Sequence, residues 1–248
     1  IYKEETGPVR IEMPYEAEWI IDNIRSHGYE AFIVGGCVRD AVLGRIPGDW
    51  DITTSAKPEQ VKEIFGKTVD TGLKHGTVTI IKHGSGYEVT TYRIDGEYLD
   101  GRHPETVEFT PDLREDLKRR DFTINAMAYN EEAGLVDIFG GIEDISKKVI
   151  RCVGDAKERF TEDALRMMRA VRFSAQLGYD IEEATRLAIC ELSQTLEKIS
   201  AERIRTELLK LLVSPHPEML RICRETGMTA VFLPEFDQMA QTVQNNPH

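Results

Sequence analysis

The sequence predicts an α+β protein in which a first part that mixes strands and helices is followed by an all-helical part. Two observations favour this fold class. Strand and helix patterns alternate up to about residue 142, and only amphipathic helical patterns follow from there on. The 248 residues suffice for one large domain or two modest ones, each with a core of its own. We place the boundary between the two parts near residue 146.

The elements of the first part follow from apolar spacing and from turn residues. Ala17, Ile20, Ile21 and Ile24 recur at helical spacing, and Gly28 ends that helix. The glycine-bearing segment 83–86 between two β-branched runs is typical of a hairpin. The polar, Gly-containing segment 95–104 is expected to be a mobile loop. The predicted elements are a helix over 16–27, a strand over 31–34, a helix over 38–43, a strand over 49–53, a helix over 58–65, and strands over 78–81 and 88–92.

The second part is expected to contain helices alone. Helical patterns cover 163–177, 181–192, 201–213 and 218–226. The last stretch, QTVQNNPH, is polar and has no closing element, so the helical part is predicted to be cut short.

Composition excludes several classes of protein. The net charge of −12 argues against a protein that coats nucleic acid indiscriminately, although basic residues gather in 147–172 and acidic residues in 85–116. No apolar run approaches the length of a membrane span, and no basic-then-apolar leader opens the chain. The four cysteines lie far apart without Cys-x-x-Cys spacing, which argues against a zinc ribbon and favours a cytoplasmic location. Cys37 is expected to be a small buried side chain.

The first chemical signal is a glycine turn between a strand and a helix. Gly35 and Gly36 allow the backbone to turn sharply and to approach a ligand closely. The helix that follows offers backbone N–H groups to a phosphate, and Arg39 adds a charged donor. By itself, such a pair of glycines after a strand is more often only a turn.

The second signal is a set of three carboxylates. Asp49 and Asp51 would share one face of a strand, where like charges are costly unless a cation lies between them. Oxygen ligands of this kind suit Mg²⁺ shared with substrate phosphates. Alone, the Asp-x-Asp pair favours a solvated edge strand, but Glu88, on the same face of a later strand as Thr90 and Tyr92, supplies a third carboxylate. The set suggests two-metal phosphoryl or nucleotidyl transfer.

Two basic segments complete the candidate set. Arg119 and Arg120 precede an apolar run, where their planar guanidinium groups match phosphate oxygens, although an exposed basic helix end would look the same. A second group recurs every three residues along a predicted helix, which is also typical of a solvated face with local ion pairs. This second group consists of Asp163, Arg166, Arg169 and Arg172.

Base chemistry offers a sharper interpretation of that second group. Cytosine and adenine both present an exocyclic amine beside an unprotonated ring nitrogen, whereas uracil and guanine present a carbonyl beside a ring N–H. Asp163 accepting from the amine and Arg166 donating to the ring nitrogen would bind C and A, and would meet U and G with mismatched partners. Arg169 and Arg172 would stack on, support or reach phosphates beside that pair.

Seven motifs in order resemble the class II tRNA nucleotidyltransferases, the CCA-adding enzymes, and the related bacterial poly(A) polymerases. These families belong to the nucleotidyltransferase superfamily that includes DNA polymerase beta. Each motif is a modest signal, but the ordered set is highly specific and spans almost all of 30–180. The motifs are VGGCVRD (34–40), GDWDITTSA (48–56), HGTVTI with YEVTTYR (75–80, 87–93), DGEYLDGRHPETVEF (95–109), LKRRDFTINAMAYN (117–130), DIFGGIEDI (137–145) and RFTEDALRMMRAVRFSAQLG (159–178).

The resemblance implies a domain plan and a role for each matched residue. It implies a polymerase-beta-like catalytic head over 1–146, a helical neck over 147–210 and the start of a helical body over 211–248. Asp49 and Asp51 would hold Mg²⁺, with Glu88 as the third catalytic carboxylate. The nucleotide-binding residues implied are Gly35, Gly36, Arg39 and Arg120 for the triphosphate, Asp163 and Arg166 for the base, and Arg169 and Arg172 for the rest of the pocket.

The implied activity is template-independent addition of CCA, or of its terminal A, to tRNA 3′ ends with CTP and ATP. The 95–109 segment matches the family's loop for adding the final A and argues against an enzyme that adds only CC. A poly(A) polymerase, an A-adding enzyme and a catalytically inactive RNA-binding module remain alternatives. The complete carboxylate set argues against the last of these. A small-molecule nucleotidyltransferase would share the glycine turn and Asp-x-Asp but would not need the Arg-rich helices.

Overall fold

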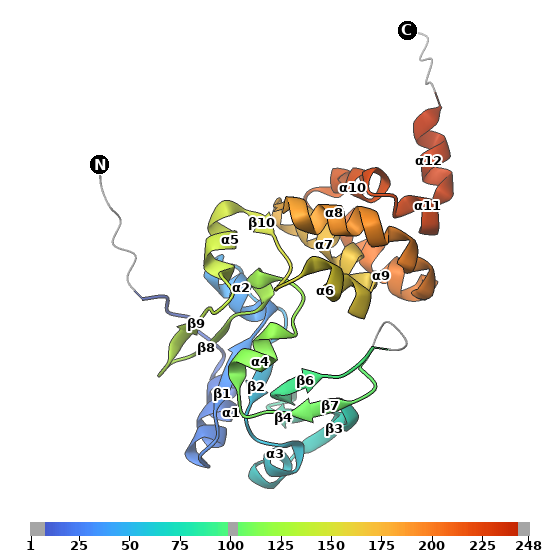
Figure 1. Cartoon of the computed structure of the whole chain (residues 1–248). Coiled ribbons are helices and arrows are strands. Elements are labelled where there is room, and N and C mark those ends of the chain that lie inside the picture. Colours follow the sequence, from blue (N-terminus) through green and yellow to red (C-terminus); the bar gives the residue numbers. More distant parts are fainter. Residues whose placement is uncertain (1–7, 99–103, 243–248) are drawn as a thin grey trace, which may run out of the picture. The chain divides into compact units, whose positions relative to one another are not determined.

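The computed structural model describes residues 8–98 and 104–242 (Figure 1). These residues form two compact units. The first, called the head unit below, contains the described residues up to Gly96 and from Pro104 to Ile145. The second, called the helical unit, runs from Ser146 onward and also includes Glu97 and Tyr98. The predicted α+β fold class, a head with a small mixed sheet followed by a helical region, is confirmed.

The head unit is built on a seven-stranded mixed sheet in the order β3-β4-β5-β2-β1-β8-β9. Neighbouring strands are antiparallel except β2 and β5, which run parallel. The predicted hairpin is confirmed, with β4 and β5 joined by His83 and Gly84, which both have positive φ as tight hairpin turns require. The strands are β1 Ala31–Val34, β2 Ile52–Thr54, β3 Thr68–Gly72, β4 Thr77–Lys82, β5 Ser85–Thr91, β8 Ala128–Asn130 and β9 Gly134–Val136.

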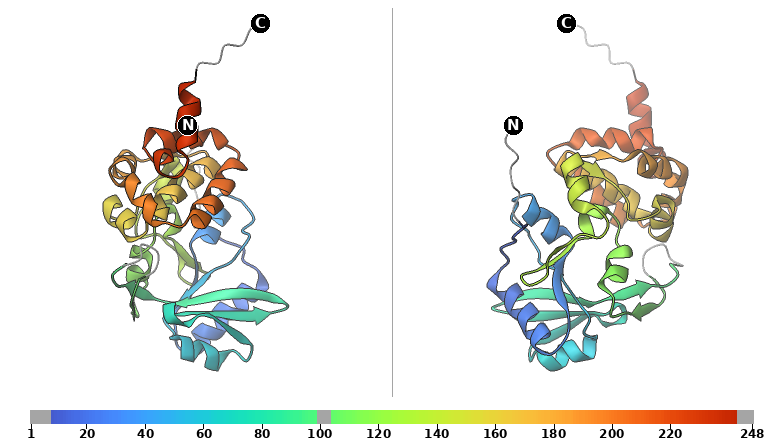
Figure 2. Two further views of the ribbon diagram at one scale, coloured as in Figure 1. Left: turned by 90° about the vertical axis from the view of Figure 1, so that its right-hand side faces the viewer. Right: turned by 60° about the vertical axis from the view of Figure 1, so that its left-hand side comes forward.

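Helices α1 (Tyr15–Ser26) and α3 (Pro58–Ile64) pack on one face of this sheet and lie side by side (Figure 2). The apolar stripe of α1 is buried, as its spacing predicted. The sheet side of this core comes from alternate strand residues, since side chains two positions apart share a face. The core residues on this face include Ile20, Ile24, Ile33, Ile52, Val61, Val78, Ile80 and Val89.

Helix α4 (Leu113–Lys118) packs on the opposite face of the sheet. Leu117 joins Phe32, Val34 and Ala128 in a second, smaller core. Tyr92, one residue beyond β5, is fully buried in the same core. This second face is the one that carries Glu88 and Thr90, so the expectation that these residues share a face with Tyr92 is confirmed.

The remaining elements of the head unit are short. Strands β6 and β7 pair antiparallel on either side of the segment expected to be a loop, and residues 99–103 of that segment lie outside the described residues. The glycine turn leads directly into α2, which begins two residues earlier than predicted. These elements are α2 Gly36–Val42, η1 Leu73–His75, β6 Arg93–Asp95, β7 Val107–Phe109, η2 Thr123–Asn125 and α5 Gly141–Lys147.

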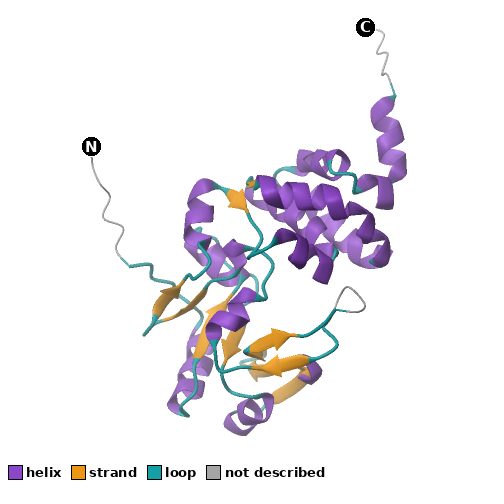
Figure 3. Ribbon diagram, in the orientation of Figure 1, coloured by secondary structure: helices purple, strands orange, loops and turns teal. Residues whose placement is uncertain are grey.

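The helical unit contains the predicted helices with small shifts in their bounds (Figure 3). It also contains a two-residue parallel pair, β10 and β11, so the expectation that strands stop near residue 142 is wrong at this point. Helix α6 and the last two helices, α11 and α12, were not predicted. The elements are β10 Val149–Ile150, α6 Ala156–Glu162, α7 Leu165–Leu177, β11 Asp180–Ile181, α8 Glu183–Leu192, η3 Ser193–Lys198, α9 Ala201–Leu212, η4 Pro217–Met219, α10 Leu220–Glu225, α11 Thr229–Phe232 and α12 Pro234–Gln241.

Two predicted elements begin later than expected in a way that affects candidate site residues. The strand predicted over 49–53 begins only at Ile52. Its partner β1 ends at Val34 because Gly35 turns the chain with φ +82°, so residues 49–50 have no strand to pair with. The helix predicted from Asp163 begins at Leu165, because Asp163 is extended (φ −143°) and its carboxylate accepts from the Leu165 N–H.

Across the described ranges, 8–98 and 104–242, no helix has the length and apolar character needed to cross a membrane.

Candidate functional site

Two of the predicted catalytic carboxylates lie side by side on the sheet face that α4 partly covers. Ile52 pairs with Val89 in the parallel β2–β5 ladder, so Asp51, one residue earlier, is level with Glu88. The Asp51 carbonyl also accepts from the Val34 N–H at 3.0 Å, which fixes the backbone of Asp51 beside β1. Both side chains are exposed. The register of three strands therefore sets the distance between these two carboxylates.

The surroundings of the Asp51 carboxyl disfavour its ionised form, although the residue as a whole is exposed. Loss of water around the carboxyl raises its pKa most, the neighbouring Glu88 raises it further, and Asp49 adds a smaller increase. Arg120 opposes these effects and lowers the pKa. Asp49 lies in the irregular segment before β2 and not on the strand, so the expected alternation with Asp51 does not hold, but its charge still acts on Asp51.

The fit of this site to a divalent cation rests on its donor chemistry. The described residues contain no group of three or more His, Cys, Asp or Glu side chains already arranged as a ligand set. The donors that do converge are carboxylate oxygens, which hard cations such as Mg²⁺ prefer. A cation would also relieve the repulsion that raises the pKa of Asp51. The residues present therefore suit a divalent cation.

Two guanidinium groups converge on the glycine turn. A Cβ placed on Gly35 would lie 3.6 Å from Arg120 Nη1, and one on Gly36 would lie 3.6 Å from Arg39 Nη2. Arg39 is almost fully buried and donates from Nη1 to Asn125 Oδ1 at 2.6 Å. Only glycine suits the positive φ of position 35. The turn thus presents backbone and two arginine side chains in one place, which is what a polyphosphate requires.

Cys37, within this turn, has the structural role expected from the sequence. Its side chain is buried, and Sγ lies 3.3 Å from the carbonyl oxygen of Val34. Burial raises the pKa of the thiol to about 11, so the thiol stays protonated at neutral pH and is a poor nucleophile.

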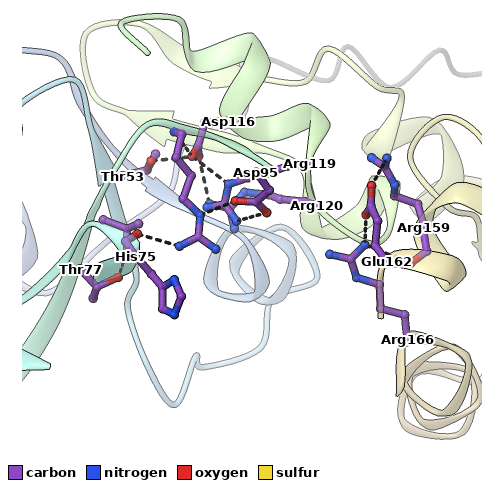
Figure 4. Close-up of polar contacts among 12 residues, drawn as sticks. Thr53, His75, Thr77, Asp95, Asp116, Arg119, Arg120, Arg159, Glu162 and Arg166 are labelled. Atoms are coloured by element: carbon purple, nitrogen blue, oxygen red, sulfur yellow. Dashed lines mark hydrogen bonds and ion pairs between the residues drawn. The ribbon is translucent and has the colours of Figure 1, made fainter. Parts of the chain in front are cut away.

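Arg120 is held in place by a buried carboxylate, Asp116, that was not among the predicted site residues. Asp116 Oδ2 accepts from Arg120 Nη2 at 3.2 Å and from Thr53 Oγ1 at 3.0 Å, while Oδ1 accepts from Arg119 Nε and from the Arg93 N–H, each at 3.2 Å (Figure 4). Burial alone would raise the pKa of Asp116, but Arg119 and Arg120 outweigh it and the pKa is lowered. Asp116 therefore links α4 to β2 and orients Arg120.

In the helical unit, Arg166 is bound to an acidic neighbour. Its Nη1 contacts Glu162 Oε2 at 2.5 Å and donates to the Arg159 carbonyl at 3.1 Å (Figure 4). Glu162 Oε1 accepts in turn from Arg159 Nη2 at 2.6 Å. Glu162 thus bridges the last turn of α6 and the first turn of α7.

Asp163 lies at the junction of α6 and α7, and both of its oxygens are used. Oδ1 accepts from the Leu165 N–H at 3.0 Å, and Oδ2 accepts from Arg203 Nη2 at 3.0 Å. Only 12% of the Asp163 side chain is exposed. The carboxylate that was predicted to read a base is therefore fixed in one orientation by the backbone of α7 and by a side chain of α9.

Asp163, Arg166, Arg169 and Arg172 are called the base-reading row below. The two remaining arginines of this row, Arg169 and Arg172, differ in environment. Arg172 is buried and pairs through Nε with the buried Glu207 of α9, while its Nη1 donates to Gln176. Arg169 is half-buried, and its guanidinium carbon lies 5.2 Å from the centre of the Phe173 ring. Arg172 thus ties α7 to α9, whereas Arg169 lies on the aromatic ring one turn further along α7.

The predicted site residues fall into two groups, one in each unit. Asp49, Asp51, Glu88, Gly35, Gly36, Arg39 and Arg120 belong to the head unit, and Asp163, Arg166, Arg169 and Arg172 belong to the helical unit. Sequence reasoning missed the residues that hold these groups, which are Asn125, Asp116, Glu162, Arg203 and Glu207. Helical spacing offered a signal for two of them, since Asp116 is four residues before Arg120 and Glu162 four before Arg166.

A head that places carboxylates beside a glycine turn with convergent arginines defines a protein of the nucleotidyltransferase class. Comparison with known proteins narrows this class. Residues 31–151 match the poly A polymerase head domain, and residues 178–239 match the domain described as the probable RNA and SrmB-binding site of polymerase A. The chain belongs to the class II CCA-adding enzyme family.

Individual relatives agree with this placement. The chain is 54% identical over 198 residues to the CCA-adding enzyme of Leuconostoc mesenteroides, covering 80% of this chain and 49% of that protein. It is 50% identical over 234 residues to the CCA-adding enzyme of Geobacillus kaustophilus, covering 94% and 58%. The chain thus spans about half the length of the curated relatives it matches.

Two solved structures are similar to the structure of this chain. The Bacillus stearothermophilus CCA-adding enzyme in complex with CTP has a TM-score of 0.83 at 47% identity, over 91% of this chain and 57% of that one. The Thermotoga maritima CCA-adding enzyme in complex with tRNA has a TM-score of 0.71 at 26% identity, over 93% and 53%.

Proposed function

We propose that this chain carries the nucleotide-adding centre of an enzyme that extends tRNA 3′ ends with CCA, or with the terminal A, without a template. The 3′-hydroxyl of the tRNA attacks the α-phosphorus of CTP or ATP, and pyrophosphate leaves. The observation that carries the proposal is the position of Asp51, which directly precedes β2 and is level with Glu88 of the parallel strand β5, in the head that also holds the glycine turn. Relatives solved with CTP, ATP and tRNA support the choice of substrates. The matched relatives are bacterial enzymes, and we place the activity in the cytoplasm.

In this proposal the head unit binds the triphosphate and places its α-phosphorus. Arg39 and Arg120, whose guanidinium groups lie beside Gly35 and Gly36, donate to phosphate oxygens at the glycine turn. Asn125 and Asp116 hold the two guanidinium groups in orientation before the nucleotide arrives, which lowers the entropic cost of binding.

The carboxylates hold the cation and define where the hydroxyl must lie. Asp49 and Asp51, together with Glu88, would hold Mg²⁺, which when bound lowers the pKa of the attacking hydroxyl and neutralises charge on the leaving group. The β1–β2–β5 register fixes Asp51 and Glu88 on a rigid surface, so little reorganisation is needed during the reaction.

The helical unit supplies base selection in this proposal. Asp163 accepts from the exocyclic amine of cytosine or adenine, and Arg166 donates to the adjacent ring nitrogen. Arg169 and Arg172 complete the nucleotide pocket. The buried position of Arg172 and its contact with Glu207 support a role in shaping the pocket wall.

An extension assay on tRNA that lacks its 3′ end tests the proposal. Mg²⁺ is supplied with CTP alone, ATP alone or both, and products are resolved to one nucleotide. Two additions with CTP and a third only with ATP are expected. Addition of A only to tRNA ending in CC would identify an A-adding enzyme, and a long A tail on generic RNA would identify a poly(A) polymerase, which the matched head domain leaves as the second candidate. No extension even at high primer concentration would favour an inactive RNA-binding module.

A further inference from the structure

Helix α9 contacts the predicted base-reading row of the helical unit at two points one turn apart. Arg203 Nη2 donates to Asp163 Oδ2 at 3.0 Å, and Glu207 pairs with Arg172. Both contacts cross between segments that are far apart in the chain, separated by 40 residues in the first case and 35 in the second. Since α9 packs along α7, the two side chains reach the row from the same helix face.

The contact with Arg203 has a chemical consequence for Asp163. A guanidinium remains protonated and offers only donors, so its ion pair with Asp163 requires the carboxylate form of that residue. A carboxylate offers only acceptors, whereas a protonated acid would also offer a donor. The Leu165 N–H on Oδ1 and Arg203 on Oδ2 together prevent the group from rotating.

Which bases an acceptor-only group tolerates follows from hydrogen-bond matching. The exocyclic amine of cytosine or adenine donates to a carboxylate, but the carbonyl at the same position of uracil or guanine would face another acceptor. A carboxylate that could rotate would no longer hold an acceptor oxygen opposite the amine, and only a protonated acid would present a donor to the carbonyl. Selectivity of this kind depends on the orientation and charge of Asp163 as much as on its presence.

We infer that Arg203 is a positioning residue that sets base selectivity, by holding Asp163 as a fixed, acceptor-only carboxylate. The inference rests on the proposed function, in which Asp163 reads the base. Arg203 itself need not touch the nucleotide to act in this way, since its Nη2 donates to Asp163. This assigns the selectivity of the pocket to α9 as well as to the α6–α7 junction.

The test measures equilibrium binding of CTP and of UTP to the 248-residue chain and to its variants, for example by calorimetry, without tRNA. For Arg203→Met, which keeps the length of the side chain without its charge, we expect the preference for CTP over UTP to fall by about tenfold, the value of one charge-assisted hydrogen bond. Arg203→Lys, which restores the charge but not the planar fork, is expected to recover part of that preference. Arg205→Gln, an exposed position on the same helix, is the matched control and should leave the preference unchanged.

A purely structural role for Arg203 would lower the affinity for both nucleotides equally, or the melting temperature alone, and would leave the CTP-to-UTP ratio as in the wild type. That result would overturn the inference. A double-variant cycle adds a second check, because Arg203→Met should have no further effect on the ratio in an Asp163→Ala background. An additional loss there would also overturn it, since Arg203 would then act by another route.

Failure of the proposed function is distinguishable from failure of this inference. A wild-type chain that prefers CTP to UTP, loses the preference in Arg203→Met and yet extends no tRNA would uphold the role of Arg203 and contradict the proposed activity of the chain. If the wild-type chain extends tRNA but Arg203→Met keeps the full preference for CTP over UTP, the proposed activity is upheld and the role of Arg203 is contradicted.

Discussion

The head unit and the helical unit hold their charged residues in opposite ways. In the head, Asp51 and Glu88 are neighbours of like charge, and the pKa of Asp51 is raised. In the helical unit the charged residues of the row are paired with opposite charges, Asp163 with Arg203 and Arg172 with Glu207. The contrast teaches that the head keeps like charges side by side at Asp51 and Glu88, whereas the helical unit pairs opposite charges and thereby fixes side-chain orientation.

Within the head, the same contrast separates two aspartates on the same side of the sheet, Asp51 just before β2 and Asp116 on α4. Asp51 is exposed beside other carboxylates, while Asp116 is buried among arginines and its pKa is lowered. An identical substitution at the two positions should therefore change stability in opposite directions.

The largest expected effect is on catalysis. Asp51→Asn should reduce nucleotide incorporation by at least about 10³-fold, because it removes charge where the transition state needs electrostatic stabilisation. Nucleotide binding without metal should survive, since Arg39 and Arg120 are untouched. The measurement is single-turnover extension, with Asp70→Asn, an exposed position on β3, as the control. Retained turnover in Asp51→Asn would contradict the assignment of Asp51 as a catalytic carboxylate.

Removing one partner of a buried ion pair should be the next largest effect. Glu207→Gln removes the buried negative charge that Arg172 Nε contacts, and we expect a loss of about 3 kcal/mol in the free energy of unfolding. Urea denaturation measures it. Replacing both partners by apolar residues, Arg172→Met with Glu207→Leu, should recover most of the loss. A single variant as stable as the wild type would show that the pair does not hold α7 to α9.

The opposite pKa shifts of the two aspartates give a pH-dependent prediction. Since the pKa of Asp116 is lowered in the folded state, its carboxylate stabilises the protein above the ordinary pKa of about 3.8, and this stability is lost as pH falls through the folded value. Asp51, with its raised pKa, destabilises the folded state at neutral pH and ceases to do so on acidification.

Melting curves between pH 3 and pH 7 measure this difference. At pH 7, Asp116→Asn should lower the melting temperature and Asp51→Asn should raise it. On acidification both variants should approach the wild type. If both variants change the melting temperature at pH 7 in the same direction, the proposed difference between Asp51 and Asp116 is contradicted.

The smallest effect is expected at an exposed ion pair. Lys62 Nζ lies 3.0 Å from a carboxylate oxygen of Asp70, and both side chains are about 40% exposed. Lys62→Met should change the free energy of unfolding by no more than about 0.5 kcal/mol, because water screens the pair and ordering both side chains costs entropy. A loss comparable to that of Glu207→Gln would mean that burial does not govern the strength of these pairs.

Local patterns explain why much of the fold could be predicted from the sequence. The apolar stripe of α1, the β4–β5 hairpin and the helices α8 and α9 depend on residues close in the chain, and their periodicity indicates them directly. The carboxylates and the glycine turn were found because their residue types carry chemistry in short motifs.

The surroundings of Asp116, the start of β2 and the conformation of Asp163 could not be predicted, because they depend on contacts that no local sequence pattern contains. The donors to Asp116 come from three separate segments, at Thr53, at Arg93 and at Arg119 with Arg120, and the sheet brings these segments together. The start of β2 depended on where its partner strand ends. Helical periodicity also concealed the extended conformation of Asp163, because an aspartate that caps a helix is indistinguishable by spacing from one inside it.

The central claim is that the head holds negative charge for a divalent cation, and titration of Mn²⁺ as a spectroscopic substitute for Mg²⁺ tests it most directly. With CTP present, bound Mn²⁺ is measured by electron paramagnetic resonance in the wild type, in Asp51→Asn and in Asp70→Asn. We predict that the wild type and Asp70→Asn bind the ion alike and that Asp51→Asn binds it at least about tenfold more weakly. Equal binding by all three proteins would contradict the claim.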